Sequence, residues 1–310
     1  MIWQSEILLI LGVWVLALLF IFPSSAAADM GAIVPGRNVT VDEPGQKAII
    51  AYNGVEEILI LGTDLQASMP TKVLRFIPFP SEPQVFLAPN TCFQNLETLF
   101  SKYEMTYLVQ VRGGGSAREA VEFRFHKRLG AHDVTVVHIR DSQHFTTWVN
   151  EFFRQKGLPH KTLSSQETSL ISDYVQRGFS FFVFDLVELG QETTSVEPLL
   201  YRFPTQHFYY PLKISKLFGK VGTIELFVFG KRRKIRQPED DPDGVRYVLR
   251  SSSAFVTADD MQRVAPEIAE LLGQEALLQA FNYKEVLFTH DVWLPESPVH
   301  EYHAYNPLSR

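Results

Sequence analysis

The apolar and polar residues of this chain follow patterns that predict several β-strands. Two apolar runs over residues 47–61 flank Asn53-Gly54, a pair typical of tight turns, and therefore predict a β-hairpin. Apolar residues fall on both faces of segment 179–189, as expected for a central strand that is covered on each side. Further strands are predicted at 134–139, 198–203, 209–214 and 223–229.

Two amphipathic helices are predicted in the middle of the chain. The first begins at Asp141 or Ser142 and places five large apolar side chains on one face: Phe145, Trp148, Val149, Phe152 and Phe153. The second begins at a capping box formed by Ser164 and Glu167 and ends at Gly178.

Shorter helices are predicted before and after this block. Thr91 and Gln94 have the spacing of a capping box at the start of a helix over 92–103. Near the C-terminus, Thr257 can cap one helical turn and Pro266 can begin another. The sequence therefore predicts an α+β fold with a mostly antiparallel sheet, two amphipathic helices in the middle and a small helical C-terminal layer.

Changes in composition divide the chain into four segments. Residues 1–28 are expected to be a signal peptide or N-terminal anchor, and residues 29–230 an exported α+β domain. Residues 231–244 carry a basic run followed by an acidic run and are expected to form a charged linker or hairpin loop. Residues 245–310 form a C-terminal strand and helix segment that ends in a Pro-rich tail.

An uncharged apolar run over residues 7–22 suggests export. As a helix it would span about 24 Å, less than the roughly 30 Å hydrocarbon core of a bilayer, and small residues follow it up to Ala28. We therefore expect a signal peptide cleaved after Ala28, with an uncleaved anchor or a buried helix as alternatives. The expected location is extracytoplasmic: the periplasm, the cell surface or the medium. Glu6 and the lack of Lys or Arg before the run depart from the usual signal.

The composition narrows the classes of partner. The net charge is −6, and without a clustered basic face a nucleic-acid partner is not expected. We expect another envelope protein or a membrane surface instead. Cys92, the single cysteine, has no partner for an internal disulfide and is interpreted as a structural, buried thiol.

Several short segments together resemble a known family. They are Gly45-Gln46-Lys47-Ala48-Ile49-Ile50-Ala51, the helix with Trp148, Val149 and Asn150, segment 174–179, and Pro198-Leu199 followed by Tyr210-Pro211-Leu212-Lys213-Ile214. In this order, over residues 29–230, the chain resembles the bacterial domain-of-unknown-function family 2330. The resemblance implies an exported protein of this fold and supplies no catalytic residues. Many members carry cysteines just after the signal. This chain has none there, so no disulfide or metal role is carried over.

Histidines near the C-terminus suggest a metal site. His290, Asp291, His300 and His303 lie within fourteen residues, and nitrogen and oxygen ligands of this kind can hold a zinc ion with an open position for water. Neighbouring prolines favour an extended tail, in which these side chains need not converge. Surface histidines are the alternative interpretation, and no other cofactor is expected.

Asp185 interrupts the apolar run of segment 179–189. A lone buried charge is costly, so we expect either a structural partner such as Arg or a backbone amide, or a functional carboxylate with a shifted pKa. Three functions remain open. The first is an extracytoplasmic binding or protein-interaction domain of the bacterial cell envelope, favoured because no local motif of nucleophilic hydrolysis is present. The second is a metal-dependent hydrolase, and the third is a structural envelope component.

Overall fold

The structure is a computed structural model that describes residues 31–35, 39–108, 118–119, 132–218, 222–231, 233–235, 247–286, 291–294 and 296–298. Within these residues the chain forms two main β-sheets and five α-helices. Among the described residues, no helix has the length and apolar character needed to cross a bilayer.

The larger sheet contains strands from both halves of the chain. Its order is β5-β10-β3-β2-β12-β16-β14-β6-β7, with β15 beside β16. Strand β12 runs parallel to β2, and the other neighbouring pairs are antiparallel. The strands are β2 (Val41–Tyr52), β3 (Glu56–Ala67), β5 (Gln84–Leu87), β6 (Tyr107–Leu108), β7 (Arg118–Glu119), β10 (Thr194–Pro204), β12 (Gly222–Gly230), β14 (Tyr247–Ser251), β15 (Ala254–Thr257) and β16 (Glu275–Val286).

The smaller sheet has the antiparallel order β1-β4-β9-β8. Its strands are β1 (Gly31–Ile33), β4 (Thr71–Phe79), β8 (Asp133–His138) and β9 (Phe181–Leu189). The chain passes directly from β3 to β4 and from β9 to β10, so two short connections link the two sheets. Two short pairs complete the strands: β11 (Phe208–Tyr210) with β17 (Val292–Leu294), and β13 (Arg233–Ile235) with β18 (Glu296–Pro298).

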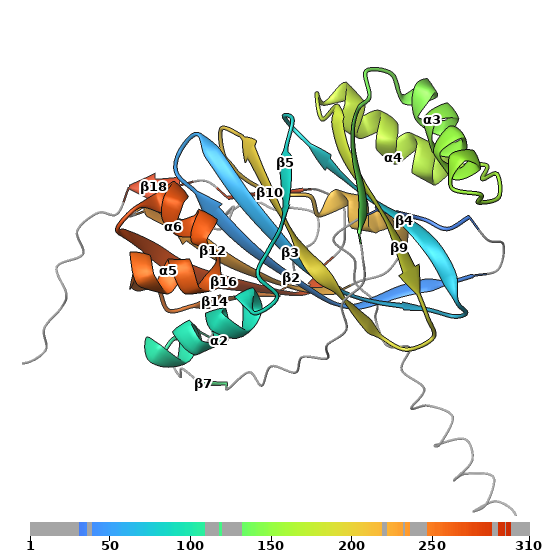
Figure 1. Ribbon diagram of the computed structural model, residues 1–310. Helices are drawn as coiled ribbons and strands as arrows, with labels where there is room; N and C mark the ends of the chain where they lie inside the picture. The colour runs from blue at the N-terminus through green and yellow to red at the C-terminus, as the bar shows by residue number, and fades with distance from the viewer. Residues whose placement is uncertain are drawn as a thin grey trace, which may run out of the picture.

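Helices cover the outer faces of both sheets, which gives a four-layer arrangement (Figure 1). Helices α3 (Ser142–Gln155) and α4 (Ser165–Gln176) pack on the smaller sheet. Helices α2 (Cys92–Lys102), α5 (Ala258–Val264) and α6 (Pro266–Leu272) pack on the larger one. A 3-10 helix, η2 (Lys213–Phe218), follows β11.

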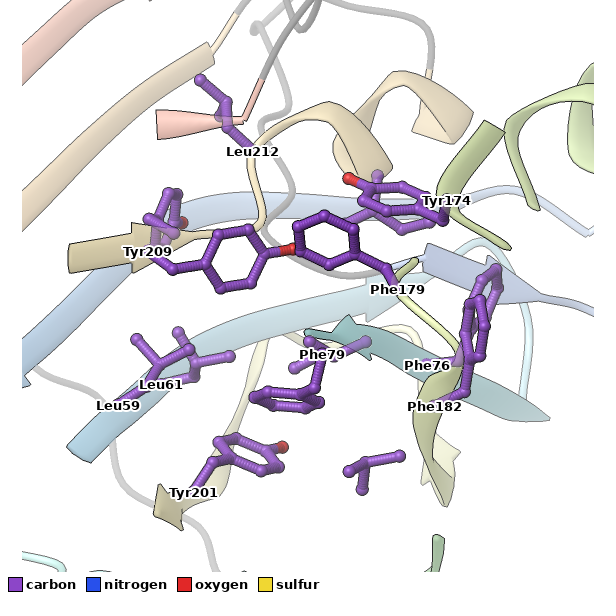
Figure 2. Close-up of a cluster of buried hydrophobic side chains, with 14 of the residues drawn as sticks. Leu59, Leu61, Phe76, Phe79, Tyr174, Phe179, Phe182, Tyr201, Tyr209 and Leu212 are labelled. Atoms are coloured by element: carbon purple, nitrogen blue, oxygen red, sulfur yellow. The ribbon is translucent and has the colours of Figure 1, made fainter. Parts of the chain in front are cut away.

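Aromatic and aliphatic side chains fill the space between the two sheets (Figure 2). Leu59 and Leu61 of β3 point into this space, where Phe79 of β4 contacts Tyr201 and Phe203 at ring distances of 5.1 and 5.0 Å. Burial of this apolar surface is the main favourable contribution to folding, at roughly 25 cal/mol per Å². The C-terminal segment takes part in the same core, because Phe281 and Tyr283 of β16 are buried in it.

The predicted α+β class is confirmed, with a mostly antiparallel sheet, two helices in the middle and a helical C-terminal layer. The hairpin predicted at Asn53-Gly54 joins β2 to β3, and Gly54 has the positive φ that its turn needs. The Ser164 capping box is present at α4. Thr91 makes no side-chain cap at α2, so that prediction was wrong; its hydroxyl accepts from Asn95 Nδ2 instead.

Segment 209–214 is not one strand as predicted. Strand β11 ends at Tyr210, and η2 begins at Lys213. Pro211 lies directly after the strand, where its missing N–H prevents further strand pairing. The chain therefore turns here and places Leu212 and Ile214 in the core.

Glu57 lies in the core between the sheets with no exposed surface. Its Oε2 accepts the backbone N–H of Tyr209 at 2.7 Å, and its Oε1 has no partner among the described residues. Burial raises the pKa of the Glu57 carboxyl well above its usual 4.5, against a smaller lowering by the Tyr209 N–H. Burial therefore favours the neutral acid over the carboxylate at this position.

We predict that Glu57→Gln removes a pH dependence of stability. The folded carboxyl keeps its proton to a higher pH than the unfolded chain, so wild-type stability falls as the pH rises from about 4.5 through the raised folded pKa. Between about pH 5 and about pH 8 the variant should gain on the order of 1 kcal/mol relative to wild type. Urea unfolding at both pH values measures this gain. Exposed Glu192→Gln is the control, and equal pH slopes for Glu57→Gln and wild type would refute the prediction.

Candidate functional site

Asp185 is buried between the two sheets and is paired. It lies directly opposite Arg75 in the register of β9 and β4, and the Arg75 guanidinium donates to Asp185 Oδ2. Both residues are at most 3% exposed. Arg75 and Asp185 occupy paired positions in two neighbouring apolar strands, so each buried charge compensates the other.

His132 joins this pair to the larger sheet. The residue immediately precedes β8, and its Nδ1 lies 2.8 Å from Asp185 Oδ2. Its Nε2 lies 3.0 Å from the main-chain oxygen of Glu197 on β10. That oxygen is available because the pairing of β10 with β3 shifts register between Val196 and Leu199.

The Asp185 carboxyl is held ionised by its partners. Burial acts to raise its pKa, but the charge of Arg75 and the contact with His132 outweigh burial, and the net pKa lies below its usual value. Asp185 Oδ1 is buried without a partner among the described residues. We call the three residues Arg75, His132 and Asp185 the inter-sheet charge cluster.

A cavity of about 390 Å³ lies beside this cluster. Its wall includes Asp133, Leu186 and Val196, which are the chain neighbours of the three groups in contact: His132, Asp185 and Glu197. The rim carries an ion pair between Lys72 and Glu188, at 3.1 Å. The cavity therefore combines an aliphatic wall with a charged rim, close to where β8 begins.

Asp291, one of the four predicted metal ligands, has donors on both carboxylate oxygens. Oδ1 accepts from the Tyr174 hydroxyl at 2.6 Å and from the backbone N–H of Lys213 at 3.0 Å. Oδ2 accepts from Arg177 at 3.0 Å. Burial raises the pKa of Asp291, and Tyr174 and Arg177 reduce this rise. In this arrangement Asp291 connects α4 to η2.

The other three predicted ligands, His290, His300 and His303, lie outside the described residues. Within the described part of the chain, no group of three or more His, Cys, Asp or Glu side chains is placed to hold a metal ion. The zinc hypothesis remains a prediction.

Cys92 is fully buried in the first turn of α2. Burial raises the pKa of its thiol to about 12, against smaller lowering by backbone N–H groups. The reactive thiolate is therefore strongly disfavoured in this environment.

A signal in the sequence marks Arg75 as well as Asp185. Arg75 interrupts the apolar strand β4 as Asp185 interrupts β9, so a search for charges inside buried strands would have paired them. The same search finds Glu225 in β12, which accepts from Tyr107 and Asn282 and lies 3.8 Å from Lys47 Nζ. His132 has no such signal, because it lies outside the predicted strand.

The four-layer α+β fold and its buried charge clusters define the chain as a globular β-sandwich protein with helical outer layers. The model of a family described as "Uncharacterized protein conserved in bacteria (DUF2330)" matches residues 23–296, and the chain belongs to this family. The resemblance inferred from the sequence is thus confirmed.

No curated protein matches the chain. Among solved structures, the crystal structure of baculovirus P35 is similar with a TM-score of 0.39 and 8% sequence identity. The match covers 84% of this chain and 97% of that chain. At this TM-score the similarity supports no argument about fold or function.

We predict that Asp185→Asn destabilises the fold by roughly 3–5 kcal/mol, because Arg75 then lacks the carboxylate that compensates its buried charge. Denaturant unfolding measures the change. Glu151→Gln removes an exposed partner of Arg154 and serves as the control, with stability expected to stay near wild type. Equal effects of the two substitutions would contradict a structural role for Asp185.

Proposed function

We propose that this protein is a non-catalytic, extracytoplasmic binding domain of the bacterial cell envelope that engages an extended segment of another envelope protein. Export is supported by the uncharged apolar run over residues 7–22. The observation that supports binding most directly is the exposed edge strand β5.

Strand β5 ends the larger sheet and exposes apolar side chains. It pairs with β10 along one side, and Phe86 and Leu87 are 45% and 58% exposed. The N–H of Ala88 donates to Pro198 O on β10, so by alternation the backbone groups of Val85 and Leu87 face away from β10. A strand edge that is unpaired among the described residues can pair with the backbone of an extended polypeptide.

A second edge lies on the same side of the molecule. Strand β8 flanks β9 and β5 flanks β10. A short connection joins β9 directly to β10 (Figure 1). Val136 of β8 is 39% exposed. This side therefore presents two strand edges with apolar side chains, whereas monomeric proteins usually protect edges with charges such as Lys.

The charged residues in and around β5 indicate which kind of segment would bind there. Residues 76–101 contain two charged side chains, Glu82 and Glu97, and neither Lys nor Arg. Glu82 is exposed two residues before β5. A complementary partner would be an extended apolar strand with a basic residue near Glu82, which fits protein recognition by strand addition.

Export is tested by fractionating cells that express the full-length chain and sequencing the N-terminus of the protein. We expect the protein in the extracytoplasmic fraction, beginning after Ala28 or retaining residues 1–28 in the membrane. Recovery of the intact chain from the soluble cytosol would refute the proposed location.

Binding is tested by cross-linking and gentle solubilisation of membranes from cells that carry Leu87→Lys or, as the control, Val55→Lys. Val55 is 70% exposed in the β2–β3 turn, away from the edge strand. We expect the wild type and Val55→Lys to co-purify with a specific partner, and Leu87→Lys to lose at least about tenfold of it, because a charge blocks strand addition. Equal recovery with both variants would contradict binding at β5.

A further inference from the structure

The His132 ring has an acceptor at each nitrogen. Its side chain is 5% exposed, so water does not replace either contact. Nδ1 faces Asp185 Oδ2 at 2.8 Å, and Nε2 faces the main-chain oxygen of Glu197 at 3.0 Å.

Neither of these oxygens can donate a proton to the ring. A main-chain carbonyl only accepts hydrogen bonds, and Asp185 Oδ2 already accepts from the Arg75 guanidinium. A neutral imidazole has one N–H and would leave one short contact between two acceptors. We infer that His132 is a buried imidazolium whose two N–H groups hold the two sheets together, and that release of its proton opens this contact.

The charges around the His132 ring are consistent with its doubly protonated, positively charged form. Strand β4 presents Arg75 and β9 presents Asp185, while β10 presents a main-chain carbonyl. On the cavity side stand Lys72, Glu188 and Asp133. These three are already in ion pairs, Lys72 with Glu188 and Asp133 with Lys156, so Asp185 is the carboxylate in contact with the ring among the described residues.

Loss of the His132 proton weakens the contact between the two sheets. One of the two acceptors then loses its donor, and a buried acceptor without a donor is unfavourable. Arg75 still donates to Asp185, so the bond to Glu197 on β10 is the one with no substitute. The cavity wall is built from the chain neighbours of these groups, so loss of the contact at high pH loosens this wall. The pH dependence of this contact does not require a partner bound at β5.

The charge state is tested directly on the wild-type protein by ¹⁵N NMR of the histidine rings. At about pH 6, we expect the His132 ring to show protons on both nitrogens, slowed in exchange by burial. A ring with one protonated and one bare nitrogen at that pH would overturn the inference. This measurement needs no variant and is therefore independent of folding defects.

Opening of the contact between the sheets is tested by amide hydrogen exchange. Protection factors are measured for β8 and for the β10 residues around Glu197 between about pH 5 and about pH 9. In the wild type, protection should fall about tenfold as His132 loses its proton. His132→Gln cannot donate to both acceptors and should show low protection at every pH. His144→Gln, which changes a histidine with an 82% exposed side chain, should behave as wild type. A pH-dependent fall that persists in His132→Gln would overturn the inference.

Discussion

The packing of two sheets against each other is the constraint on which the rest of this structure depends. Two short connections, β3 to β4 and β9 to β10, carry the chain from one sheet to the other, so these four strands have an inner face that must be filled. Aromatic rings from distant segments fill it: Phe79, Tyr201, Phe203 and Tyr209 contact one another between the sheets (Figure 2). Close packing of this kind leaves little room for an unpaired polar group.

This constraint explains how the buried charges are arranged. Arg75 and Asp185 face each other across the register of β4 and β9, and His132 extends the contact to β10. An apolar replacement could match their stability, so the cluster is better understood as fixing how the sheets align. It also separates the main core from a smaller apolar cluster near the two connections between the sheets, which contains Val73 and Val187. The proton that we infer on His132 completes the contact between Asp185 on β9 and Glu197 on β10.

Much of the fold could be predicted because its signals are local. The turn at Asn53-Gly54, the capping box at Ser164 and the apolar stripe from Phe145 to Phe153 depend on residues close in sequence. The site could be predicted only in part. Asp185 stands out in an apolar strand, whereas its contact with His132 depends on where β8 begins. Of the four predicted metal ligands, Asp291 lies within the described residues, where it accepts from Tyr174 and Arg177, and its role as a ligand stays a prediction.

The sequence by itself determined the fold class, most of the predicted strands and helices, and the family, because periodicity and capping are encoded within a few residues. Only the tertiary structure decided the order of strands in each sheet, the parallel pairing of β2 with β12, and the donors around each buried carboxylate. Several of these contacts join residues more than a hundred positions apart, such as Arg75 with Asp185 and Tyr174 with Asp291. No local pattern specifies which distant backbone or side chain completes a hydrogen bond.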